Sequence, residues 1–263
     1  MYVYITYLLL FSVKLAAGNI LVAKSRCPLY IVTLATNEYS TQSAFLRSQI
    51  AKISGRKCDL EIVTTNCTFQ ELTKFKTNEV RQHKNSFAGI DVKIRAILSV
   101  LERIPQNSVF LWLDSSLVVF NKYNFSRIKL SMKRREILFA REGSGKKIGA
   151  NIGVILMKNT PRVTQLFNTT LSYVRQGHWD QGIVCCLLGL HTGYSCKNIK
   201  TLSKTLKWSY LNNRFAAVKK VGPYSCDFRK KFKGISERNL PMFLKLIGDS
   251  KRRARCLEIL RKP

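Results

Sequence analysis

The stretch Val109-Phe-Leu-Trp-Leu-Asp-Ser-Ser-Leu-Val-Val-Phe120 decides the fold of this chain. It is an apolar, β-branched and aromatic run, typical of a buried strand, and it is interrupted by Asp114 and two serines. In open α/β sheets, ligands bind beyond the carboxyl ends of the strands, so a carboxylate here faces the expected active-site crevice. A turn between two core strands would also accommodate an aspartate, so this segment alone leaves both interpretations open.

Strand-like and helix-like segments alternate before Asp114. Residues 28–35 and 60–64 are short β-branched runs, whereas residues 40–54 and 91–103 place apolar side chains at helical spacing. This alternation predicts an α/β fold, with a mostly parallel sheet flanked by helices in a single domain.

Further segments of both kinds follow Asp114. The expected strands are residues 136–140 and 152–157. The expected helices are residues 161–175, 179–190 and 239–262, the last with a basic face that is most simply a solvated surface.

Composition and charge limit the classes of function. The chain has 263 residues, of which 46% are hydrophobic, which is enough for a core and excludes a disordered protein. Its 45 Lys and Arg against 15 Asp and Glu give a formal charge of +30, which predicts attraction to phosphates, acidic glycans and anionic membrane surfaces. Nucleic acid is a disfavoured partner, because the positive residues are spread along the chain without a nucleic-acid-binding motif.

The amino terminus is typical of a secretory signal. Residues 1–18 form an apolar stretch that ends in small residues, although a signal anchor extending to Ala23 would also fit. Residues 27–263 are then expected to form the folded domain, in the lumen of the endoplasmic reticulum or Golgi, or secreted. Association with a membrane would occur through the amino terminus or the basic surface.

The cysteines and glycosylation sequons agree with that compartment. The even number of cysteines, eight, permits disulfides without fixing their pairing. Three Asn-X-Ser/Thr sequons begin at Asn66, Asn124 and Asn168.

Four separated motifs occur in an order that points to a family. They are Thr33-Leu-Ala-Thr36, Leu111-Trp-Leu-Asp-Ser-Ser116, Gly149-Ala-Asn-Ile-Gly-Val154 and Trp179-Asp-Gln181. Together they resemble the GT-A glycosyltransferases, in particular nucleotide-diphospho-sugar transferases of the galactosyl- and arabinosyltransferase kind. Typical strings of these enzymes are WLDxD, NxGxxL and DQ, and the resemblance covers roughly residues 28–235.

The resemblance implies a donor site. Thr33, Ala35 and Thr36 would hold the nucleotide, and Asp114 would bind a divalent cation, Mn²⁺ or Mg²⁺, on the diphosphate. Lys93 matches a basic residue near the donor, although a solvated helix lysine is the plain alternative.

The same resemblance implies a sugar site. Asn151 and Gly153 match a turn against the donor sugar, where glycine permits close approach. Asp180 and Gln181 match the pair expected near the transferred sugar and the acceptor, as the catalytic residues. As a plain helix N-cap, Asp180 would need no function.

Two positions depart from the family pattern. Ser116 stands where the second acid of WLDxD would be, so the expected cation would bind more weakly than at a two-carboxylate site. Lys231, in Lys231-Phe-Lys-Gly234, aligns with a histidine of a later family motif and is expected to contact phosphate directly.

The expected function is transfer of a sugar from a nucleotide-diphosphate donor, UDP by analogy, to a glycan or glycoprotein acceptor. The positive charge favours an acidic acceptor, and the resemblance implies retention of anomeric configuration. The alternative is a catalytically inactive, transferase-like or basic secreted protein that binds polyanions.

Overall fold

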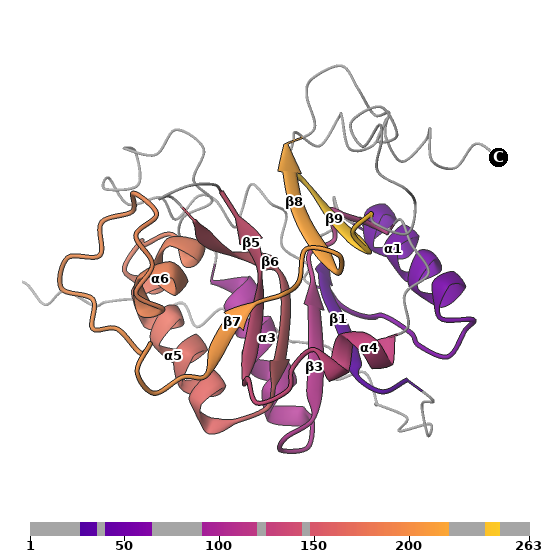
Figure 1. Ribbon diagram of the computed structural model, residues 1–263, viewed down its shortest axis with the longest axis horizontal. Helices are drawn as coiled ribbons and strands as arrows, with labels where there is room; N and C mark the ends of the chain where they lie inside the picture. Colours follow the sequence, from indigo (N-terminus) through magenta and orange to yellow (C-terminus); the bar gives the residue numbers. More distant parts are fainter. Residues whose placement is uncertain are drawn as a thin grey trace, which may run out of the picture.

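A six-stranded mixed sheet forms the centre of the computed structural model (Figure 1), which describes residues 27–35, 40–64, 91–119, 125–143, 148–220 and 240–247. In spatial order, the strands are β2 (Glu61–Thr64), β1 (Tyr30–Ala35), β3 (Val109–Leu113), β6 (Gly149–Lys158), β5 (Ile137–Glu142) and β7 (Trp208–Tyr210). Strand β6 runs antiparallel to both of its neighbours, and the other three strand pairs are parallel. The predicted mostly parallel α/β sheet is confirmed.

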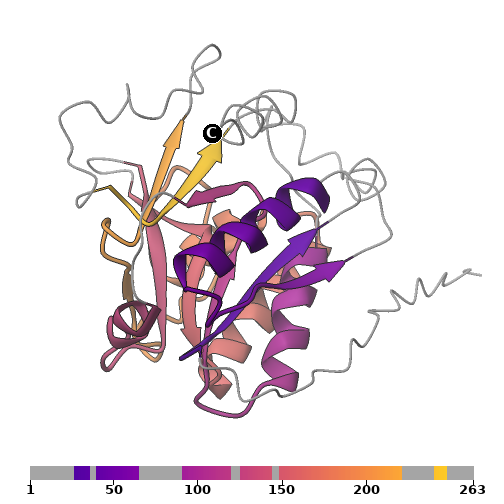
Figure 2. The same cartoon turned by 90° about the vertical axis from the view of Figure 1, so that its right-hand side faces the viewer.

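Helices cover both faces of this sheet. One face carries α3 (Val92–Arg103), α5 (Pro161–Arg175) and α6 (Asp180–Leu187), and the other carries α1 (Ser40–Ile53) and α4 (Phe125–Leu130), as Figure 1 and Figure 2 show. Strand β3 serves both cores, because successive side chains of a strand point to opposite faces. Phe110 and Trp112 pack with the first group of helices, and Leu111 and Leu113 with the second.

A second, three-stranded sheet lies beside the first. Its order is β4 (Leu117–Val119), β9 (Phe243–Ile247) and β8 (Ala216–Lys220). The helix expected over residues 239–262 is therefore wrong for residues 243–247. Pairing with strands on both sides and burial of Phe243 and Leu244 stabilise the extended conformation there, against the apparent helical periodicity.

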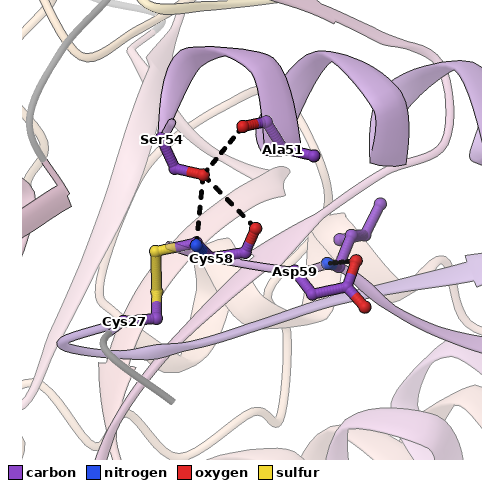
Figure 3. Close-up of a disulfide and its surroundings, with 6 residues drawn as sticks. Cys27, Ala51, Ser54, Cys58 and Asp59 are labelled. Atoms are coloured by element: carbon purple, nitrogen blue, oxygen red, sulfur yellow. Dashed lines mark hydrogen bonds between the residues drawn. A yellow bond between two sulfur atoms is a disulfide. The ribbon is translucent and has the colours of Figure 1, made fainter. Parts of the chain in front are cut away.

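Two disulfides lie within the described residues. Cys27 and Cys58, 31 positions apart, join the segments that lead into β1 and β2 (Figure 3). The hydroxyl of Ser54 accepts a hydrogen bond from the Cys58 N–H at 3.1 Å, which fixes the chain between α1 and the disulfide. The second disulfide links Cys186 of α6 to Cys196. Disulfides persist in oxidising compartments, which agrees with the predicted lumenal or secreted location.

Several predicted features lie outside the described residues. They are the signal segment, Thr36, Asn66, Cys67, Asn124, Cys226, Lys231 and Cys256. Asn168, the remaining sequon, is exposed on α5. Within the described ranges, no helix has both the length and the apolar character needed to cross a bilayer.

Candidate active site

The site begins where β3 ends. The backbone N–H of Asp114 still donates to the carbonyl of Gly153 in β6, at 2.8 Å, so the residue is held at the edge of the sheet. The chain then turns directly into β4, whose Leu117 lies opposite Lys245 of β9. The small sheet thereby brings a lysine from the carboxyl-terminal region to the end of β3.

Two lysines enclose the Asp114 carboxylate. Lys93 Nζ lies 2.7 Å from Oδ1, and Lys245 Nζ lies 2.7 Å from Oδ2. The indole N–H of Trp112 also donates to Oδ1, at 3.1 Å. Burial on its own would raise the pKa of Asp114, but attraction to Lys245 and Lys93 outweighs it and holds this pKa well below its usual range. The carboxylate is therefore ionised under all ordinary conditions.

Lys93 is not a solvated helix lysine. It is placed by the first turn of α3, and its side chain is only 14% exposed. Its ammonium group lies 6.0 Å from the centroid of the Trp112 ring, within the range of a cation–π contact. Lys93 thus contributes a mostly buried cation to the end of β3.

Gly153 provides the space for the second lysine. A Cβ atom at this position would lie 2.5 Å from Lys245 Nζ and 2.7 Å from Asp114 Oδ2. Real Cβ atoms essentially never approach other atoms so closely, so any side chain here would displace the Lys245 ammonium group or the Asp114 carboxylate. Gly153, which the resemblance placed against a donor sugar, therefore has a packing role within the protein itself.

We expect Gly153→Ala to push Lys245 away from Asp114 and to lower the free energy of unfolding by about 1–3 kcal/mol. Urea denaturation of the purified protein measures this difference. Gly149→Ala is the matched control on the same strand, since the atoms nearest to its Cβ would be the Thr192 methyl group at 3.0 Å and the Cys185 sulfur at 3.5 Å, with no charged group among them. Equal stability of the Gly153 variant and the wild type would contradict the assigned contact.

A hydrogen-bonded network lies between β5, β6 and α6. Glu142 accepts from Asn151 Nδ2 at 2.9 Å and from Gln181 Nε2 at 2.6 Å. Asn151 Oδ1 in turn accepts from the Gly153 N–H at 2.8 Å. Asn151 and Gln181, which the sequence motifs placed in one site, are thus joined through Glu142, a residue that those motifs did not include.

Asp180 is the first residue of α6. Its Oδ1 accepts a hydrogen bond from the Gln181 N–H at 2.7 Å, while the N-cap position belongs to Trp179. Asp180 is therefore not the plain N-cap considered as its alternative. Burial raises the pKa of Asp180, and attraction to Lys93 opposes that rise. The carboxylate thus interacts electrostatically with the cluster around Asp114.

Aromatic side chains fix the beginning of α6. The Tyr194 ring packs against Gly182, where a Cβ would come within 2.8 Å of it, and the Tyr194 hydroxyl lies 2.9 Å from His178 Nδ1. Trp179 contacts the same ring edge to face. Together with the Cys186–Cys196 disulfide, these contacts hold Asp180 and Gln181 in a defined position.

The remaining predicted donor residues are placed as follows. Thr33 and Ala35 lie within β1 and are buried, rather than in the loop after it. Strands β1 and β3 are parallel neighbours, so both end at the edge that carries Asp114. Ser116 lies half-buried in the turn between Asp114 and β4. Lys245 and Glu142 are the site residues that the sequence interpretation missed.

Known structures resemble this fold, although the sequence matches no protein-family model and no curated protein. A glycosyltransferase involved in glycosylation of the major capsid of PBCV-1 is similar with a TM-score of 0.54 and 16% identity, over 88% of this chain and 99% of that one. The galactosyltransferase LgtC, in complex with donor and acceptor sugar analogs, has a TM-score of 0.46 and 13% identity, over 89% and 97% of the two chains. Mouse xyloside xylosyltransferase 1 has a TM-score of 0.42 and 13% identity, over 82% and 97%. The first of these likenesses shows a GT-A glycosyltransferase-like fold.

Proposed function

We propose that this chain is a glycosyltransferase that moves a hexose or pentose from a nucleotide-diphosphate donor to a glycan or glycoprotein. The observation that carries the proposal is the pairing of Lys93 and Lys245 around Asp114, which interacts electrostatically with Asp180. This cluster lies at the carboxyl end of a strand in a GT-A-like sheet, where open α/β sheets generally bind their ligands. The glycosyltransferase of similar fold that is involved in glycosylation of the PBCV-1 major capsid supports the proposal of a glycoprotein acceptor.

The two lysines suit the departure of a nucleotide diphosphate. Negative charge develops on the diphosphate as the bond to the sugar breaks, and preorganised cations stabilise it most in a site with little water. The Lys93 and Lys245 side chains are 14% and 18% exposed, so they meet a phosphate without first losing a full hydration shell. UDP is the proposed donor nucleotide by resemblance alone.

The carboxylate of Asp180 suits the sugar half of the reaction. Positive charge develops at the anomeric carbon in an oxocarbenium-like transition state, and a nearby carboxylate stabilises it. The network of Glu142, Asn151 and Gln181 would orient the sugar beside this carboxylate. Retention of anomeric configuration is proposed from the resemblance.

The acceptor is proposed to be acidic. A formal charge of +30 raises the local concentration of anionic partners and makes their association sensitive to salt. Increasing ionic strength should therefore raise KM for an acidic acceptor more than KM for a neutral one.

Calorimetric titration with UDP, GDP and uridine tests the donor site. At roughly 0.3 M salt, where charges more than about 6 Å apart are largely screened, we expect saturable binding that prefers one base. Binding should be followed by slow hydrolysis of the matching nucleotide sugar, or by transfer when an acceptor is present. Binding without either reaction would support the inactive polyanion-binding alternative. No saturable binding of any nucleotide would contradict the donor site itself.

A further inference from the structure

The residues around Asp114 do not fit a divalent cation. Mg²⁺ and Mn²⁺ prefer several oxygen ligands, and the carboxylate oxygens of Asp114 each contact an ammonium group at 2.7 Å instead. Ser116 replaces the second acid of the motif. Over the described ranges, no three His, Cys, Asp or Glu side chains gather into a potential metal site.

We propose that Lys245, together with Lys93, takes the place of the metal and binds the donor diphosphate directly. This inference rests on the proposed transferase function and makes that function independent of a divalent cation. The two ammonium groups and the Asp114 carboxylate sum to a charge of +1, whereas a divalent cation between two carboxylates would sum to zero.

The pairing of the small sheet places Lys245 beside Asp114. The residue lies on β9, the central strand of the small sheet, and its register opposite Leu117 directs it to Asp114. Phe243 and Leu244, which precede it, are buried. A lysine is almost never placed among such residues unless its charge is paired, and Gly153 leaves the space that this pairing needs.

Both ammonium groups keep hydrogen-bonding capacity for a ligand. Each has three N–H donors, and Asp114 accepts one from each. Asp114 therefore acts as a positioning residue that holds two cations side by side. The remaining donors suit the oxygens of a diphosphate, with charge-assisted hydrogen bonds.

Titration of the full chain with UDP and with uridine, in Mn²⁺ and in EDTA, tests this inference. We expect the wild type to bind UDP equally well in both conditions. Lys245→Ala should weaken UDP binding by about 10- to 100-fold, because it removes a hydrogen bond to a charged group. Uridine has no phosphate, so its binding should be unchanged. Lys245→Met should weaken UDP binding to the same extent, and its unbranched apolar side chain fills more of the space that the alanine variant leaves empty. Thermal melting of both variants checks that they are folded.

A matched control removes one charge elsewhere. Lys200→Ala deletes an exposed lysine outside the cluster of Asp114, Lys93 and Lys245, and at roughly 0.3 M salt it should change UDP affinity by less than about twofold. A loss equal to that of Lys245→Ala would mean that only the overall charge matters, and would overturn the inference.

The double variant Ser116→Asp with Lys245→Ala provides a gain-of-function test. It restores the second acid and removes the competing ammonium group, so we expect UDP binding to become dependent on Mn²⁺. Strong UDP binding by the wild type that EDTA abolishes would overturn the metal-independent site while leaving the transferase proposal intact. Failure of the wild type to bind any nucleotide would overturn both.

Discussion

Replacing Asp114 with alanine is expected to lower the free energy of unfolding by about 3–5 kcal/mol, because it leaves two mostly buried lysines without their shared counter-ion. It also removes the acceptor of the Trp112 indole N–H. Urea denaturation of wild type and variant, followed by tryptophan fluorescence, measures the difference. This loss should exceed the loss caused by either lysine substitution, since each of those leaves Asp114 paired with the other lysine.

Asp59→Ala is the control for this experiment. Asp59 also pairs with a cation, Arg47, but both side chains are more than half exposed. Solvent screens such a pair, so its removal should change stability by less than about 1 kcal/mol. Similar losses in the two variants would contradict the buried position of the Asp114 cluster.

The dependence of stability on pH tests the same ion pairs. The folded-state pKa of Asp114 is lowered, so the stabilisation that it provides is complete above its unfolded pKa of about 3.9 and is lost as the pH falls toward the folded value. The stability difference between wild type and Asp114→Ala should therefore shrink below about pH 4. A difference that grows with acidification would contradict the sign of the pKa shift.

The layered fold could be predicted because each layer has a local pattern. The strand at residues 109–113 is a short apolar run that ends in a polar residue, and the helix at residues 91–103 has one apolar face; the structure contains both. Asp114 comes directly after this strand, so its place at the end of the strand could also be predicted. Neighbouring parallel strands end at one edge, so the location of the site follows from the predicted sheet.

Lys245 could not be found in the same way. Its segment, Leu240-Pro-Met-Phe-Leu-Lys-Leu-Ile247, has apolar residues at spacings that fit a helix as well as a strand, and a lysine on such a helix is normally solvated. Pairing with β4 and β8, from distant parts of the chain, decides the conformation. The signal that was available is the single charge within an apolar run, which predicts a buried ion pair once the run is assigned as a strand.

Glu142 escaped prediction for a related reason. It ends β5 and becomes part of the site only because β5 pairs with β6, which places it beside Asn151 and Gln181. A sequence motif identifies residues that are close along the chain, whereas this carboxylate is joined to the site by sheet pairing. The pairing of β5 with β6 shifts in register between Phe139 and Ala140. The residue opposite Glu142 therefore does not follow from counting along the two strands.

Replacing Asp180 with asparagine is expected to reduce the rate of sugar transfer by about 10²- to 10³-fold while leaving UDP affinity nearly unchanged. The substitution keeps a side-chain oxygen that can accept from the Gln181 N–H, so the beginning of α6 should be retained. It removes the negative charge that would stabilise an oxocarbenium-like sugar. Single-turnover kinetics with the donor found by titration, at saturating acceptor, separates this loss from any change in binding.

The pH dependence of that rate distinguishes a catalytic carboxylate from a structural one. Burial raises the pKa of Asp180, while Lys93 and Lys245 oppose the rise and ionised Asp114 adds to it. Protonation should therefore abolish transfer at a pH above the ordinary aspartate value of about 3.9, giving an acid limb in wild type. Asp180→Asn should have a low rate without this limb, whereas Asp59→Asn should keep both the rate and the limb. If Asp180→Asn transfers sugar at a rate close to that of wild type, the negative charge of Asp180 takes no part in the reaction. The role of the side chain would then be limited to its hydrogen bond with the Gln181 N–H.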